Sequence, residues 1–162
     1  MANKLSQLAK NIQVKVKLAQ LKAAKEVAQL IPEIIKLRTR QEGEGVSGPL
    51  DSLEDSTIKY RKRYEDNLHP DTDPNRSNLT ATGQLIDSIQ GRNVGTKIII
   101  EPRKGKRKGE LSGGKSRLTN REVLKYVEQN GRVFHELSKE EKQELIDLIE
   151  QIIKEELASV IK

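Results

Sequence analysis

The sequence predicts an α+β fold, with a long N-terminal helix, a C-terminal helix and strand structure between them. Apolar residues recur every three or four positions over residues 5–37 and again over residues 145–160, which is the spacing of one helix face. Residues 98–100 are three consecutive Ile, and Gly95 and Pro102 bound them, which is typical of a buried strand. We therefore expect two terminal helices around a mixed central region.

The first helix is predicted from Lys4 to about Arg40, with Asn3 as its N-cap. Pro32 should kink or split it near Ile31, because proline lacks an N–H group and clashes with the preceding turn. One face carries an apolar stripe, which consists of Leu5, Leu8, Ile12, Val16, Ala19, Ala23, Val27, Leu30, Ile34 and Leu37. This stripe needs a covering surface, which is either the C-terminal helix or a neighbouring subunit.

Two connections and a short helix are expected next. Residues 41–56 contain three Gly, a Pro and several acids, which indicates a loop. Residues 56–66 predict a short helix with Ser56 or Thr57 as its cap. Residues 67–78 contain two Pro and predict a connection rich in turns.

The centre of the chain predicts a helix followed by a strand. Residues 79–89 form the helix, Thr80 or Thr82 caps it, and Gly91 stops it. The strand covers residues 96–101.

Two capping boxes mark the last two helices. Residues 119–122 (TNRE) open a helix that Gly131 closes. Residues 132–137 alternate weakly between apolar and polar and are expected to be extended. Residues 138–141 (SKEE) open the closing helix, which runs through Val160.

The charge of the chain is polarised. The net charge is +6, yet residues 122–162 carry ten Asp and Glu against six Lys and Arg, and residues 1–121 carry a net +10. A basic body can face DNA or an acidic partner, and the polarity lets neighbouring copies attract each other head to tail.

The chain has no Cys, which excludes disulfides, thiolate metal sites and a Cys nucleophile. We expect no membrane span, since no apolar run approaches about 20 residues. We also expect no signal peptide, since Met1 to Lys10 contain no apolar region followed by a small-residue cleavage site.

A basic loop is predicted over residues 103–121, where eight basic residues stand against one acid and four Gly. The basic residues are Arg103, Lys104, Lys106, Arg107, Lys108, Lys115, Arg117 and Arg121. No aromatic residue lies among them, so any contact with nucleic acid should be with the backbone and insensitive to sequence. The alternatives are a solvated loop and a loop that an acidic partner surface orders.

Residues that carry chemistry are sparse. His69 and His135 lack the ligand spacing of a metal site, and we expect both at the surface or its boundary. Residues 109–116 (GELSGGKS) match a phosphate-binding loop, but no apolar strand precedes them and no helix follows at once. We expect a flexible loop there, and no catalytic residue, metal or cofactor in the protein.

Three segments carry a resemblance to a known family: residues 56–58 (STI) followed by basic residues, residues 79–89 (LTATGQLIDSI), and residues 126–134 (YVEQNGRVF) ahead of an acidic helix. Over about residues 50–160, the chain resembles the tail-completion and virion-morphogenesis proteins of tailed bacteriophages. The L-T-x-T-G segment followed by L-x-x-S-I is the strongest of these motifs.

The resemblance implies helices packed on a small, mostly antiparallel sheet, with further strands in residues 92–94, 117–118 or 132–135. The chain then divides into a basic amphipathic helix, residues 1–40, and one tail-completion-like α+β domain, residues 41–162.

It also implies a non-enzymatic virion protein that forms a homo-oligomeric ring at the head–tail junction, or neck, after assembly in the host cytoplasm. The implied partners are further copies, portal or adaptor proteins, tail-tube or terminator proteins, and packaged DNA. Two other hypotheses stay open: a sequence-independent DNA-binding protein outside any virion, and a nucleotide-dependent enzyme built on residues 109–116.

Overall fold

The computed structural model describes residues 2–77, 79, 81–105, 107, 110 and 112–161, without the side chains of residues 2–5, 8 and 159–161. The elements are α1 (Ala2–Leu37), a π-helical turn (Arg38–Glu42), β1 (Glu44–Gly45), β2 (Gly48–Pro49), α2 (Asp55–Arg63), a 3-10 turn (Glu65–Asn67), α3 (Gln84–Ser88), β3 (Ile89–Val94), β4 (Lys97–Pro102), α4 (Asn120–Gln129) and α5 (Lys139–Ile161). Two antiparallel sheets of two strands each accompany these helices. The α+β class is therefore confirmed.

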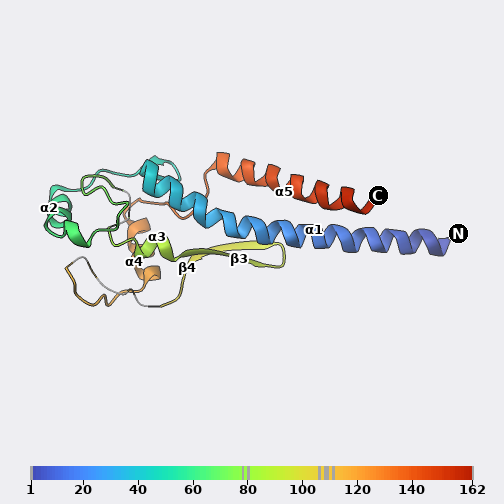
Figure 1. Ribbon diagram of the computed structural model, residues 1–162, viewed down its shortest axis with the longest axis horizontal. Helices are drawn as coiled ribbons and strands as arrows, with labels where there is room; N and C mark the ends of the chain where they lie inside the picture. Colours follow the sequence, from blue (N-terminus) through green and yellow to red (C-terminus); the bar gives the residue numbers. More distant parts are fainter. Residues whose placement is uncertain are drawn as a thin grey trace.

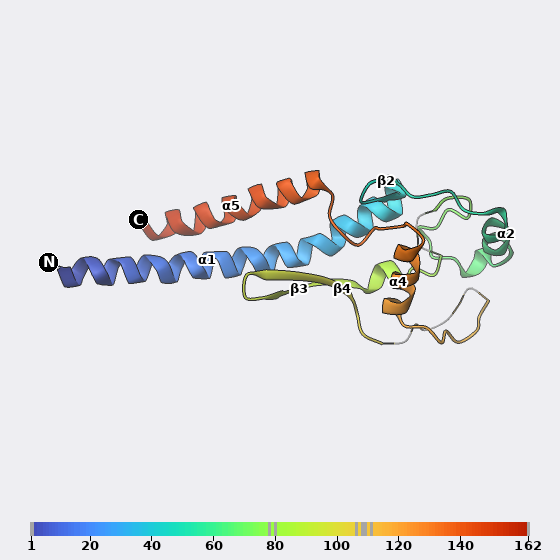
Figure 2. The same ribbon diagram turned by 180° about the vertical axis from the view of Figure 1, so that it is seen from behind.

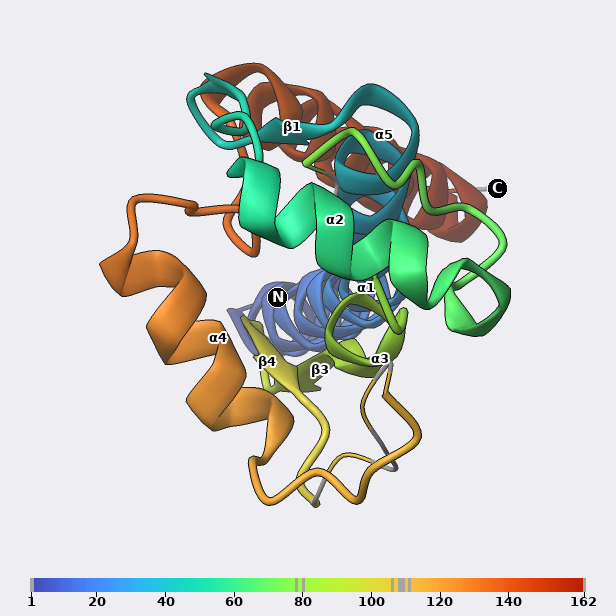
Figure 3. The same cartoon turned by 90° about the vertical axis from the view of Figure 1, so that its left-hand side faces the viewer.

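Helix α1 is the axis of the molecule. Helix α5 lies along one side of it and the β3–β4 hairpin along another, while α2, α3 and α4 gather at its C-terminal end (Figure 1). The end view in Figure 3 places α5 and the hairpin on opposite sides of α1. The helix continues past Pro32, and its axis bends in the C-terminal half, which contains this residue (Figure 2).

Gly91 lies inside β3, so the prediction that it stops a helix was wrong. Helix α3 ends at Ser88, and Ile89 already pairs with Pro102 in the hairpin. A Cβ atom on Gly91 would overlap the backbone carbonyl of Ala28 in α1. Glycine is therefore required here because the strand lies with its backbone directly against the helix.

The predicted strand over residues 96–101 is confirmed as β4, but it is half-buried rather than buried. A two-stranded sheet with a helix on one face turns only alternate residues inward. Ile98 and Ile100 pack on the core, and Ile99 lies between them in the strand. Residues 92–94 belong to β3 as expected, whereas residues 117–118 and 132–135 form no strand.

The helix boundaries were predicted best where a capping box exists. The Thr119–Glu122 box opens α4, and Ser138 and Glu141 exchange the same pair of hydrogen bonds at the start of α5. Helix α2 instead begins at Asp55 after Glu54, so neither Ser56 nor Thr57 is its cap.

The central helix is shorter than predicted. Helix α3 follows Gly83, whose left-handed backbone (φ 67°) turns the chain, so Thr82 is not a cap; Thr80 lies outside the described residues. The expected loop over residues 41–56 contains the short β1–β2 hairpin.

The core lies at the C-terminal half of α1, where the other elements meet. It consists of Val27, Ile31, Ile35, Leu85, Ile86, Ile89, Leu124, Phe134 and Leu145. Phe134, the single Phe of the chain, is completely buried. The apolar residues of the 79–89 motif therefore serve packing. Among the described residues, no helix is both long and apolar enough to cross a bilayer.

Candidate functional site

The structure brings three of the eight predicted basic-loop residues into one place. Arg103, Lys104 and Arg121 line a hollow of about 210 Å³ between the end of β4 and the start of α4, together with Pro102, Gly105 and Thr119. Arg121 is the second residue of α4 and not part of a loop. The hollow is therefore a basic surface at a defined place in the fold.

Glu101 reduces the positive charge of this hollow. Its carboxylate accepts hydrogen bonds from Arg92 (3.0 Å) and Arg121 (2.8 Å). The hydrogen bond from Arg92, supported by the charges of Arg92, Arg121 and Lys104, holds the pKa of Glu101 below its usual value. The excess positive charge of the hollow therefore comes from Arg103 and Lys104, which are both exposed.

The other predicted basic residues do not join this hollow. Arg107 turns inward and donates a 2.7 Å hydrogen bond to the hydroxyl of Thr82, and burial lowers the pKa of its guanidinium. Lys115 and Arg117 are exposed elsewhere on the loop. Lys106 and Lys108 lie outside the described residues. The described structure therefore brings three of the eight predicted residues together, and their contact with DNA or a partner stays a prediction.

The phosphate-loop hypothesis lacks its structural context. Such loops lie between a parallel strand and a helix, whereas both sheets among the described residues are antiparallel pairs. The Ser116 side chain is buried and lies 3.4 Å from the amide nitrogen of Leu118. Gly109 is outside the described residues. The described part of the chain also has no group of His, Asp and Glu side chains placed to hold a metal ion.

The two histidines are half-buried, as expected of boundary residues. His69 lies 3.6 Å from Asp71 and 3.8 Å from Asp87, and its ring packs against Gly83. His135 lies beside Glu128 in α4. Each histidine therefore contacts a residue from a segment other than its own.

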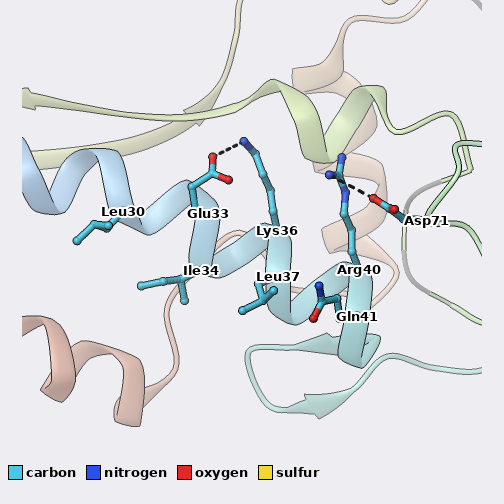
Figure 4. A pocket seen from close by; sticks show the side chains of 8 residues that line it. All are labelled: Leu30, Glu33, Ile34, Lys36, Leu37, Arg40, Gln41 and Asp71. Atoms are coloured by element: carbon cyan, nitrogen blue, oxygen red, sulfur yellow. Dashed lines mark hydrogen bonds and ion pairs between the residues drawn. The ribbon is translucent and has the colours of Figure 1, made fainter.

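A second surface was not predicted from the sequence. An open groove of about 630 Å³ follows the C-terminal half of α1, and Figure 4 shows the side chains that line it. They are Leu30, Glu33, Ile34, Lys36, Leu37, Arg40, Gln41 and Asp71. Three of them belong to the apolar stripe, and Leu30 and Leu37 are 43% and 53% exposed. The stripe thus leaves a substantial apolar surface in contact with water.

The groove has an acidic rim. Glu33 pairs with Lys36 at 2.6 Å, and Arg40 pairs with Asp71 at 3.6 Å. The carboxylate side chains are 68% and 53% exposed, but the Lys36 and Arg40 side chains only 21% and 17%. An approaching molecule therefore meets the carboxylates first.

The apolar stripe is also uncovered at the start of α1. Helix α5 runs antiparallel to α1, as ion pairs between Arg38 and Glu141 and between Lys22 and Glu156 show. Because α5 ends at Ile161, it reaches only to about residue 17 of α1. Residues 2–18 form an overhang that projects beyond α5 and the hairpin (Figures 1 and 2). Ile12 in this overhang is 50% exposed.

Arg38 fixes the position of α5. Its buried guanidinium pairs with Glu141 and donates hydrogen bonds to the carbonyl oxygens of Phe134 (2.6 Å) and Glu136 (2.9 Å). The charge of Arg38 gave no reason to predict that its side chain is buried. Its position four residues after Ile34, one helix turn along the stripe, was the available signal.

The comparisons with known proteins gave no match. No protein-family model matches the chain, and neither a curated protein nor a solved structure matches it significantly.

Proposed function

We propose that this chain is a non-enzymatic structural protein that assembles with copies of itself, as a ring subunit at the head–tail junction of a tailed bacteriophage. The observation that carries the proposal is the apolar stripe of α1. Helix α5 accompanies α1 from about residue 17 to Arg38, yet Leu30 and Leu37 within this section stay exposed, as does Ile12 before it. Exposed apolar surface at two places on one helix is typical of a protein that completes its burial against other chains.

The head–tail assignment rests on the sequence motifs. The 79–89 segment supplies Leu85, Ile86 and Ile89 to the core, so its likeness to phage tail-completion proteins concerns residues that build the fold. The proposed partners are further copies, portal or adaptor proteins, and tail-tube or terminator proteins. Packaged DNA would meet the hollow of Arg103 and Lys104 through its phosphates.

The test is the mass and shape of the purified chain at high concentration. Light scattering coupled to size exclusion, followed by negative-stain electron microscopy, should give a defined oligomer and closed rings. Mass spectrometry of phage particles should find the protein in the virion. A strict monomer at every concentration, absent from particles, would remove the proposal.

A second function is favoured by the basic hollow: sequence-independent DNA binding outside a virion. Fluorescence anisotropy with duplex DNA at several salt concentrations tests it, because two phosphate contacts contribute a slope of about −1.8 to the logarithmic salt dependence. The double variant Arg103→Glu, Lys104→Glu should abolish binding. Lys154→Glu, at an exposed position of α5, should retain most of the DNA affinity. Binding that survives the double variant would exclude this hollow as the DNA contact.

A further inference from the structure

We infer that the overhang of α1 (residues 2–18) docks into the groove of Leu30, Ile34 and Leu37 on a second copy of the chain. The inference rests on the proposed self-assembly and names the surfaces that perform it. Three features of the described residues carry it: the apolar character of both surfaces, the opposite signs of their more exposed charges, and a geometry that prevents a chain from filling its own groove.

The overhang and the groove carry the same apolar stripe. Its positions repeat after eleven residues, as in Leu8, Ala19 and Leu30, or Ile12, Ala23 and Ile34. This repeat gives about 3.67 residues per turn, close to the 3.6 of an α-helix, so the stripe turns only slowly around the helix. Ala19 and Ala23 are buried in the section that α5 accompanies. The overhang therefore presents the kind of surface that already packs against a helix in this fold.

The groove is formally neutral, because Lys36 and Arg40 pair with its two carboxylates, but its more exposed charges are opposite to those of the overhang. Residues 2–25 contain six Lys and no Asp or Glu, and Lys10, Lys15 and Lys17 in the overhang are exposed. The rim of the groove presents Glu33 and Asp71 to solvent. A basic amphipathic helix is thus complementary to this groove both in its apolar stripe and in its rim charges.

A chain cannot place its own overhang in its own groove. Ile12 and Leu37 belong to one helix, and 25 residues of helix separate them by about 37 Å. An overhang that fills this groove therefore belongs to another copy, and the contact joins two different surfaces. Such head-to-tail contacts produce rings when the rotation closes and filaments when it does not.

Disulfide cross-linking tests this contact cleanly, because the chain has no Cys of its own. We would mix full-length Ile12→Cys protein with full-length Leu37→Cys protein under mild oxidation. Both positions are half exposed, so neither substitution should prevent folding. A disulfide requires Cα atoms within about 7 Å, so a 12–37 bond reports docking between copies. Non-reducing gels and mass spectrometry of the linked peptides should show this bond.

The matched control is Val14→Cys mixed with Leu37→Cys. Val14 is 58% exposed, similar to Ile12 at 50%, but two residues turn a helix by about 200°, so it faces away from the stripe. We expect the 12–37 bond to form several-fold faster than the 14–37 bond. Glu33→Lys should slow the 12–37 bond by opposing the overhang lysines.

Three outcomes would overturn the inference, and they are distinguishable. Equal rates at positions 12 and 14 would mean random collision. An oligomeric wild-type chain without the 12–37 bond would assign the groove to another partner and leave the proposed assembly intact. A monomeric wild-type chain would remove the inference together with the proposed function.

Discussion

Replacing Arg38 by Met should lower the free energy of unfolding by about 3 kcal/mol. The Met side chain fills similar space but removes the ion-pair partner of the half-buried Glu141 carboxylate and the side-chain donor to the carbonyls of Phe134 and Glu136. Removing one member of a buried pair typically costs about 3–5 kcal/mol, and we take the lower end because Glu141 retains some contact with water. Since Arg38 joins three segments, the loss should appear as destabilisation of the whole fold.

Urea denaturation followed by far-UV circular dichroism measures this change. With a slope of about 1–3 kcal/mol per molar urea, the midpoint should fall by roughly 1 M or more. Arg40→Met is the matched control, because the partners of Arg40, Asp71 and Asp87, are about half exposed, and such pairs contribute at most about 1 kcal/mol. A loss no larger for Arg38→Met than for Arg40→Met would refute the reasoning that Arg38 holds α5 in place.

Three further predictions concern packing and pH. Gly91→Ala should destabilise the chain by about 1–3 kcal/mol, because the new methyl group overlaps the carbonyl of Ala28 and the strand must move; thermal unfolding measures it, and unchanged stability would contradict the close approach. Phe134→Ala should cost about 3–5 kcal/mol in urea denaturation, because this ring is completely buried, and a cost below about 1 kcal/mol would mean that the core does not depend on it. Glu101 has a folded-state pKa below its usual 4.5, so its ionised form stabilises the fold above that pH and the contribution is lost as the pH falls below it. Melting temperatures in an acid titration should therefore fall less steeply for Glu101→Gln than for the wild type, and parallel curves would show that the pairing with Arg92 adds no stability.

The local elements of this fold could be predicted because their signals are local. Two capping boxes fixed the starts of α4 and α5, since each is a pair of hydrogen bonds within four residues. The apolar stripe predicted α1 by its spacing alone. The helix predicted over residues 79–89 was too long because Ile89 fits a helix face and a strand equally well, and only its pairing with Pro102 decides between them.

The candidate site could be predicted only in part. The cluster of basic residues was visible in the sequence, but the loop path determines that Arg103 and Lys104 line a hollow while Arg107 turns inward to Thr82. The groove beside Leu37 could not be predicted either, because it also depends on the path of the chain. The sequence shows that Leu37 is on the stripe and does not show where α5 leaves it uncovered.

By itself, the sequence determined the helical stripe, the caps, the strand over residues 96–101 and the opposite charges of the two terminal helices. Each of these depends on residues a few positions apart, where the backbone geometry is nearly fixed. The tertiary structure alone decided that Gly91 lies against Ala28, that Arg38 is buried, and that α5 leaves the stripe exposed at Ile12, Leu30 and Leu37. Those features depend on contacts between segments that are far apart in the sequence, and the packing of the whole molecule determines these contacts.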